Sequence, residues 1–150
     1  MALQEDIMSA LKVAMKAKDQ VALTSLRAIK SAILLAQTES GAKQELSQDE
    51  EIKILQKLVK QRNDSAAIFA EQNRNDLAAP ELAQAAIISK FLPEQLSEEA
   101  VAKVVEGVIA ATGASGMKDM GRVMGIVSKE LAGQAAGKVI SSVVKRMLTA

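Results

Sequence analysis

Apolar residues recur every three or four positions along most of the chain, a spacing that predicts amphipathic helices. The first stripe, with Met8 and Ala14 beside it, consists of Leu3, Ile7, Leu11 and Met15. A second stripe, expected to end near Gly41 as a left-handed glycine, consists of Leu23, Leu26, Ile29, Ile33 and Leu34. Ser47 and Glu50 have the spacing of a capping box, which predicts the start of a long third helix that continues to about Gln72.

A fourth helix is predicted after a break at Asn73–Asp76. Pro80 suits the first turn of this helix, where its missing N–H has no acceptor to lose. Its apolar stripe consists of Leu82, Ala86, Ile87 and Phe91. Pro93 restricts Leu92 to extended conformations and therefore stops the helix.

Three shorter helices are predicted beyond Pro93. Ser97 is the expected cap of the first, whose inward positions are Val101, Val104, Val105, Val108 and Ile109, and Gly113 its end. Ser115 is the expected cap of the second, with Met117, Met120, Val123, Met124, Val127 and Leu131 on one side and Gly133 beyond its end. The third runs from about Ala136 with Val139, Ile140, Val143, Val144, Met147 and Leu148 inward. The pattern thus predicts an all-α fold of two helical parts: a bundle of about four helices over residues 1–92 and a three-helix unit over 93–150.

Composition supports helices and restricts chemistry. Of the 150 residues, 49% are hydrophobic, yet Phe69 and Phe91 are the only aromatic residues, so aliphatic side chains must fill the core. The chain has no Cys and no His, which excludes thiolate nucleophiles, zinc–sulfur sites and Ser-His-Asp catalysis within it. The paired carboxylates at Glu50–Glu51 and Glu98–Glu99 fall in first helical turns, where the helix dipole favours negative charge. We therefore expect no catalytic residue, metal or cofactor.

The amino-terminal stretch lacks the continuous apolar core of a secretory signal, and no apolar run approaches the length of a membrane span. The sequence therefore suggests a soluble, cytoplasmic protein without a membrane partner.

Charge is unevenly distributed although the net charge is only +1. Between Lys12 and Lys30, five basic residues accompany Asp19 alone, a local charge of +4. From Met117 to the end, two acidic residues, Asp119 and Glu130, accompany six basic ones. These six are the candidate RNA-binding residues: Lys118, Arg122, Lys129, Lys138, Lys145 and Arg146. Both basic zones could accept a polyanion or could simply be solvated helix faces.

Short motifs add little by themselves. Gly113–Gly116 has the G-x-x-G form of an RNA-clamping loop, but a helix-ending glycine followed by a turn glycine explains it as well. Ser142 and Lys145 have the spacing of a serine–lysine pair without its companion motifs, so they are read as surface positions.

Two glycines inside the predicted helix after Ser115 call for an explanation, because glycine destabilises a helix interior. Gly121 and Gly125 are four residues apart and share one helix face. We expect close helix packing at this face, with the side chains of Met117, Met120 and Met124 adapting around the contact. Direct contact of the glycines with phosphate is the alternative.

Several segments together resemble one family, in order and over nearly the whole chain. They are Leu26–Lys30, Gln61–Ser65, Phe91–Leu96, Gly116–Gly125 and Gly137–Ser141. The chain resembles the YqeY family of the GatB/YqeY group, and its carboxy-terminal part resembles the tail domain of the B subunit of the glutamine-dependent tRNA amidotransferase. That tail is an all-helical appendage that contacts the outer corner of the tRNA.

The resemblance implies an all-α fold of two helical parts and a role linked to tRNA or tRNA-dependent amidation. It does not imply catalysis, because the catalytic domains of the amidotransferase are absent; a label of carbon–nitrogen ligase activity with glutamine as donor would be inherited from the larger enzyme. The residues that match the tail-domain motif are Lys118, Gly121, Arg122, Gly125, Gly137 and Lys138. The chain departs from the family at Gln134 and Ala136, where a basic and an acidic residue are frequent.

Two functions follow as hypotheses. The first is a non-catalytic tRNA-binding module, or an accessory of amidotransferase or tRNA synthetase machinery. The second is a protein-interaction module with no RNA ligand, whose methionine-rich face receives the partner.

Overall fold

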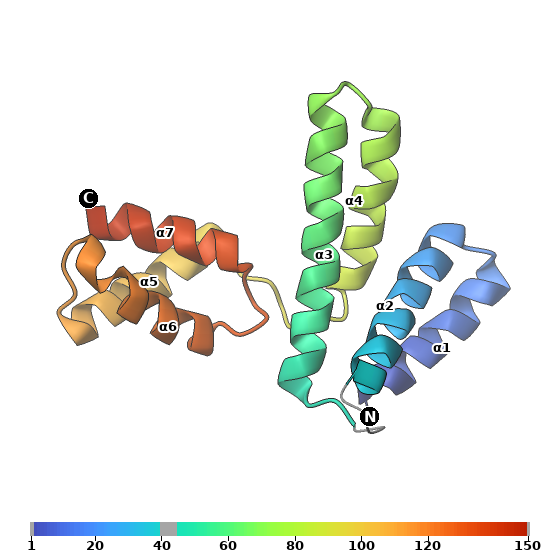
Figure 1. Ribbon diagram of the computed structural model, residues 1–150, viewed down its shortest axis with the longest axis horizontal. Helices are drawn as coiled ribbons and strands as arrows, with labels where there is room; N and C mark the ends of the chain where they lie inside the picture. The colour runs from blue at the N-terminus through green and yellow to red at the C-terminus, as the bar shows by residue number, and fades with distance from the viewer. Residues whose placement is uncertain (1, 40–44, 150) are drawn as a thin grey trace. The chain divides into compact units, whose positions relative to one another are not determined.

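The computed structural model describes residues 2–39 and 45–149 (Figure 1). Within these ranges the chain forms helices and no strand, so the predicted all-α class is confirmed. The elements are α1 (Ala2–Ala17), α2 (Gln20–Glu39), α3 (Gln48–Glu71), α4 (Asn75–Ser89), α5 (Glu98–Thr112), the 3-10 turn η1 (Met117–Asp119), α6 (Met120–Glu130) and α7 (Gly137–Thr149). They fall into two compact units, Met1–Leu92 and Pro93–Ala150.

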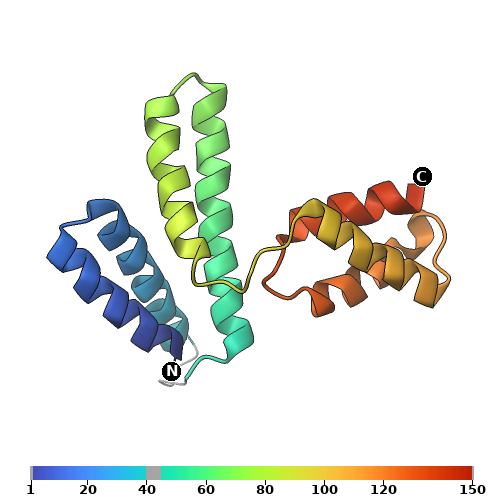
Figure 2. The same cartoon turned by 180° about the vertical axis from the view of Figure 1, so that it is seen from behind.

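The first unit consists of two antiparallel hairpins, α1–α2 and α3–α4 (Figures 1 and 2). Helix α2 packs against α1, α3 and α4, whereas α1 packs extensively against α2 alone among the described helices. Aliphatic side chains fill the core, among them the fully buried Ile7, Ile29, Leu55 and Ile88. Ser25 is buried with them and donates its hydroxyl to the Val21 carbonyl at 2.8 Å, which satisfies its polar group inside the helix.

Local hydrogen bonds fix the helix ends of this unit. The predicted capping box is confirmed: the Glu50 N–H donates to Ser47 Oγ at 3.2 Å, and the Ser47 N–H donates to Glu50 Oε2 at 2.7 Å. Residues in the left-handed region follow α1 and α3: Lys18, with φ 54°, comes directly after α1, and Asn73, with φ 60°, two residues after α3. The glycine expected to end the second helix, Gly41, lies outside the described residues.

The prediction for the fourth helix is wrong in two respects. Helix α4 begins at Asn75, so Pro80 lies inside it rather than in its first turn. Pro80 has no N–H to donate to the Asp76 carbonyl one turn earlier, and both residues are exposed. The buried face is formed by Ala78, Ala85 and Ile88, while Leu82 of the predicted stripe is 52% exposed.

Some apolar residues of the predicted stripes in α1 and α2 are exposed. Met15 and Leu34 belong to the predicted stripes but are 54% and 59% exposed, and Met8 beside the first stripe is 48% exposed. Because α1 has a single extensive neighbour, only a narrow strip of its surface, containing Leu3, Ile7 and Ala14, is buried.

The second unit is formed by α5, α6 and α7 around an aliphatic core (Figure 1). Val101, Val105, Val123, Val127 and Val144 are completely inaccessible to solvent. Ser97 caps α5 by accepting the Ala100 N–H at 3.2 Å, and Gly113 ends the helix in the left-handed conformation, both as predicted. The Leu96 N–H donates to the Gln134 carbonyl at 2.8 Å, which ties the start of the unit to the segment between α6 and α7.

No helix among residues 2–39 and 45–149 has by itself the length and apolar character needed to cross a bilayer. The segments Glu98–Thr112 and Met117–Glu130 meet that test only as a pair, bent by 97°.

Candidate nucleic-acid interface

The loop between α5 and α6 determines how the first candidate residues are held. Gly113 and Gly116 adopt positive φ angles of 67° and 74°, and the chain then forms η1 before α6 begins. Ser115 does not cap this helix, contrary to the sequence prediction. Instead the backbone N–H of Ser115 donates to Asp119 Oδ2 at 2.8 Å, so the Asp119 carboxylate holds the loop that precedes α6.

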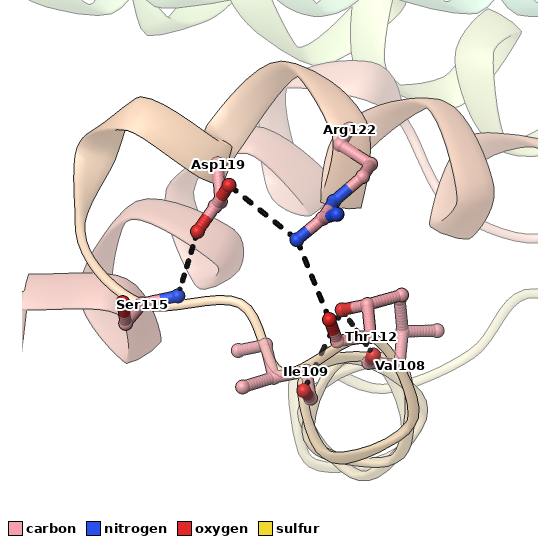
Figure 3. Close-up of polar contacts among 6 residues, drawn as sticks. All are labelled: Val108, Ile109, Thr112, Ser115, Asp119 and Arg122. Atoms are coloured by element: carbon pink, nitrogen blue, oxygen red, sulfur yellow. Dashed lines mark hydrogen bonds and ion pairs between the residues drawn. The ribbon is translucent and has the colours of Figure 1, made fainter.

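Arg122 completes this arrangement (Figure 3). Its Nη2 lies 3.4 Å from Asp119 Oδ1 and 3.4 Å from the carbonyl oxygen of Thr112. Thr112 is the last residue of α5. The Thr112 hydroxyl donates back to the Val108 carbonyl at 2.8 Å. We call Thr112, Ser115, Asp119 and Arg122 the α5–α6 clasp. Arg122 is about half exposed, and its guanidinium on α6 contacts both Asp119 and the end of α5.

The exposed face of α6 carries basic side chains and also glycines, at which no side chain covers the backbone. Arg122 and Lys129 are seven residues apart, about two helical turns, and therefore lie on the same side of the helix. Gly125 lies between them and Gly121 one turn before it, and all four residues are exposed. Lys118 precedes this face in η1 and is exposed as well.

The exposed face of α7 is entirely basic or neutral, because this helix contains no acidic residue. Lys138 and Lys145 are two turns apart with Ser142 between them, and Arg146 follows directly. All of these residues are exposed. Within the described ranges none of Lys118, Lys129, Lys138, Lys145 or Arg146 forms an ion pair, whereas Arg122 does. The six candidates therefore occupy two helix faces and the turn before α6.

The structure corrects the expectation of close helix packing at the two glycines. A Cβ atom built on Gly121 or on Gly125 would meet no heavy atom within 4 Å. Both residues lie on the exposed side of α6, so among the described residues no second backbone approaches them. Packing against the described residues therefore does not require glycine at either position.

The methionines expected around that contact lie elsewhere. Met120 and Met124 are partly buried and pack against the core of the second unit, while Met117 is 46% exposed. The methionine-rich docking face that the sequence suggested is thus reduced to one exposed side chain. No group of three or more acidic side chains in the described part of the chain is arranged to hold a metal ion.

Sequence comparison identifies relatives among curated proteins. The chain is 35% identical over 139 residues to "Altered inheritance of mitochondria protein 41, mitochondrial" of Clavispora lusitaniae, a match that covers 89% of this chain and 80% of the relative. It is 38% identical over 82 residues to the protein of the same name of Meyerozyma guilliermondii, covering 55% of this chain and 42% of that relative. These names contradict the expectation of a cytoplasmic protein, because both relatives are mitochondrial proteins by name.

The family comparison agrees with the segments noted in the sequence. The model of the family described as "Yqey-like protein" matches residues 4–148, which span α1 to α7 and therefore both units of the structure. On the basis of this match and of the two relatives, the chain belongs to the YqeY family.

Proposed function

We propose that this YqeY-family protein binds tRNA without catalysing a reaction on it, as an accessory of tRNA-dependent amidation. The observation that carries the proposal is the combination of unpaired cations and exposed glycines on α6 and α7. The resemblance of residues 116–141 to the tRNA-contacting tail of the amidotransferase B subunit supplies the class of ligand.

The charges support contact with a phosphate backbone. Five of the six candidate cations have no ion-pair partner among the described residues, so no internal salt bridge has to break when they meet phosphate. Long lysine side chains on an exposed helix face can follow a curved backbone. With Phe69 and Phe91 both in the first unit, the second unit has no ring on which to stack a base, so it would read the shape and phosphates of a folded RNA.

The exposed glycines support a close approach of the RNA to the backbone of α6. Gly125, inside α6, costs the helix roughly 1 kcal/mol relative to alanine, and a Cβ at this position would meet no described heavy atom within 4 Å. A ligand that reaches the helix surface between Arg122 and Lys129 would use the space that a side chain at Gly125 would fill. This favours the alternative of phosphate contact over the packing role that the sequence suggested.

The proposed role is recognition because the chain lacks the usual chemical groups of an enzyme that acts alone. Without His or Cys it has neither the commonest general base nor a thiolate. The curated relatives are mitochondrial by name, and phosphate contacts would serve a tRNA of any compartment equally.

Titration of a labelled tRNA transcript by fluorescence anisotropy tests the proposal. We expect the logarithm of the association constant to fall linearly with the logarithm of the salt concentration between about 50 and 200 mM. Each of Lys129→Gln, Lys138→Gln and Lys145→Gln should weaken binding and reduce the magnitude of the salt slope by about 1.

Lys57→Gln on α3 is the matched control, since Lys57 is also exposed on a helix but belongs to the first unit. It should leave the salt slope unchanged. Absence of binding at the lowest salt concentration, or equal losses for Lys57→Gln and the α7 variants, would remove the proposal.

A further inference from the structure

The hairpin α1–α2 carries an apolar hollow that the proposed RNA contact does not use. The hollow has a volume of about 210 Å³ and is lined by Gln4, Ile7, Met8, Lys30, Ile33 and Leu34. Ile7 and Ile33 form its buried floor, while Met8 and Leu34 stand at its edges, 48% and 59% exposed. At this volume it falls below the range of about 300–1,000 Å³ typical of small-molecule pockets, so it suits inserted side chains.

The exposed apolar surface continues from the hollow along α1. Met15 lies two turns after Met8 on α1 and is 54% exposed. On α2, Leu34 itself borders the hollow, whereas the exposed Leu35, as the next residue along the chain, points to another side of the helix. Because α1 packs extensively only against α2 within the described chain, no other helix covers this side of α1. The antiparallel helices α1 and α2 lie side by side (Figures 1 and 2), and we call the hollow between them, extended along α1 by Met15, the α1–α2 groove.

Positive charge flanks this groove on both helices. Lys12 lies one turn after Met8, and Lys30 is itself part of the lining. Arg27 lies one turn before Lys30 on the same side of α2. On α1, the acidic residue Glu5 lies one turn before Met8. Lys12, Arg27 and Lys30 are exposed and form no ion pair with any residue the structure describes.

We propose that the α1–α2 groove binds an acidic amphipathic helix of a partner protein. Apolar side chains at helical spacing would enter the hollow between Met8 and Leu34, and Asp or Glu residues on either side would meet Lys12, Arg27 and Lys30. Methionine suits such a surface because its unbranched side chain adapts to different inserted shapes. An RNA ligand is disfavoured here, since phosphates gain nothing from an apolar floor.

A designed peptide tests the chemistry directly. The probe has about 15–18 residues, enough for four helical turns, with Leu on one face and Glu on both flanks. A second peptide keeps every Leu and replaces every Glu by Lys. We expect the acidic peptide to bind the full chain at least roughly tenfold more tightly than the basic one in fluorescence anisotropy.

Variants at exposed positions locate the binding. Leu34→Gln should weaken binding of the acidic peptide about tenfold by removing an apolar contact, and Lys30→Glu should weaken it and reduce its salt dependence. Leu82→Gln and Lys57→Glu, at exposed positions of α4 and α3, are the matched controls and should bind as the unchanged chain does. Circular dichroism establishes that each variant is folded.

Several results would overturn the proposal. They are equal binding of both peptides, no binding of the acidic peptide, and equal losses in the groove and control variants. If Lys30→Glu weakened binding of the acidic peptide and Leu34→Gln did not, the peptide would be bound by charge alone and not by the apolar groove. Displacement of the peptide by tRNA, or a dimer in sedimentation that Leu34→Gln dissociates, would assign the surface to RNA or to a second copy.

Discussion

The backbone N–H of Ser115 donates to the carboxylate of Asp119 at 2.8 Å, so the later residue holds the earlier one in the turn before α6. The same carboxylate lies 3.4 Å from Arg122 Nη2, which also reaches the carbonyl of Thr112. One acidic side chain therefore organises the junction of two helices (Figure 3).

Asp119→Ala should destabilise the second unit by about 1 kcal/mol, because it removes the acceptor of the Ser115 N–H and the partner of Arg122. Urea-induced unfolding followed by circular dichroism measures this loss. Asp119→Asn keeps an acceptor oxygen for Ser115 and should lose less. Equal losses for the two variants would show that the hydrogen bond to Ser115 contributes nothing.

Gly125→Ala should change stability and RNA affinity in opposite directions. With no atom within 4 Å of the new Cβ, the variant should gain up to about 1 kcal/mol of helix stability, yet tRNA should bind more weakly. Gly107→Ala on α5 is the matched control, since Gly107 is also exposed with nothing within 4 Å. It should gain stability and bind tRNA normally. If both variants bind tRNA equally well, the glycine is not part of the interface.

The capping box at the start of α3 should contribute to stability in a pH-dependent way. Hydrogen bonds from the backbone and then the side chain of Ser47 lower the pKa of Glu50 in the folded state. A carboxylate with a lowered pKa stabilises the fold above its unfolded pKa, and this contribution disappears as the pH falls through the folded value. The stability difference between the unchanged chain and Glu50→Gln should therefore shrink below about pH 4.3.

Glu51 is the control for that experiment, because burial raises its pKa, the opposite direction. An acid with a raised folded pKa opposes folding while it is ionised, and this opposition is relieved as the pH falls through the raised value. Glu51→Gln should accordingly not lose stability at neutral pH. A loss for Glu51→Gln that matches the loss for Glu50→Gln would contradict the capping account.

Helix α1 should exchange its amide hydrogens faster than α2. Since α2 packs against three helices and α1 extensively against one, opening α1 exposes less apolar surface. Hydrogen exchange followed by mass spectrometry compares the two helices in one molecule, so α2 serves as the internal reference. Equal protection of α1 and α2 would indicate that the hairpin opens only as a whole.

Local signals predicted several helix ends correctly, although Ser115 does not cap α6 as expected. Ser47, Ser97 and Gly113 act within one turn of the chain, and each lies where the sequence placed it. The start of α4 has no such signal, because Arg74 at its N-cap makes no side-chain capping bond. Pro80 therefore does not mark the start of α4, and the buried face contains Ala78, Ala85 and Ile88 instead of the predicted Leu82.

The candidate site depended more on tertiary information. The sequence shows that Gly121 and Gly125 share a face, but periodicity cannot tell whether another helix covers that face. It also cannot show that Arg122 reaches the carbonyl of Thr112, ten residues away along the chain. For the same reason the predicted apolar stripes include Met15 and Leu34, which are 54% and 59% exposed because α1 packs extensively against α2 alone among the described helices.

The aliphatic core of the second unit has a practical consequence for spectroscopy. Phe69 and Phe91 both precede Pro93, and the chain contains neither Trp nor Tyr. A tryptophan introduced at the exposed position of Met117, beside the α5–α6 clasp, would thus be the sole indole fluorophore of the protein. A change in its emission would report ligand binding at this turn, without overlapping emission from another Trp or Tyr.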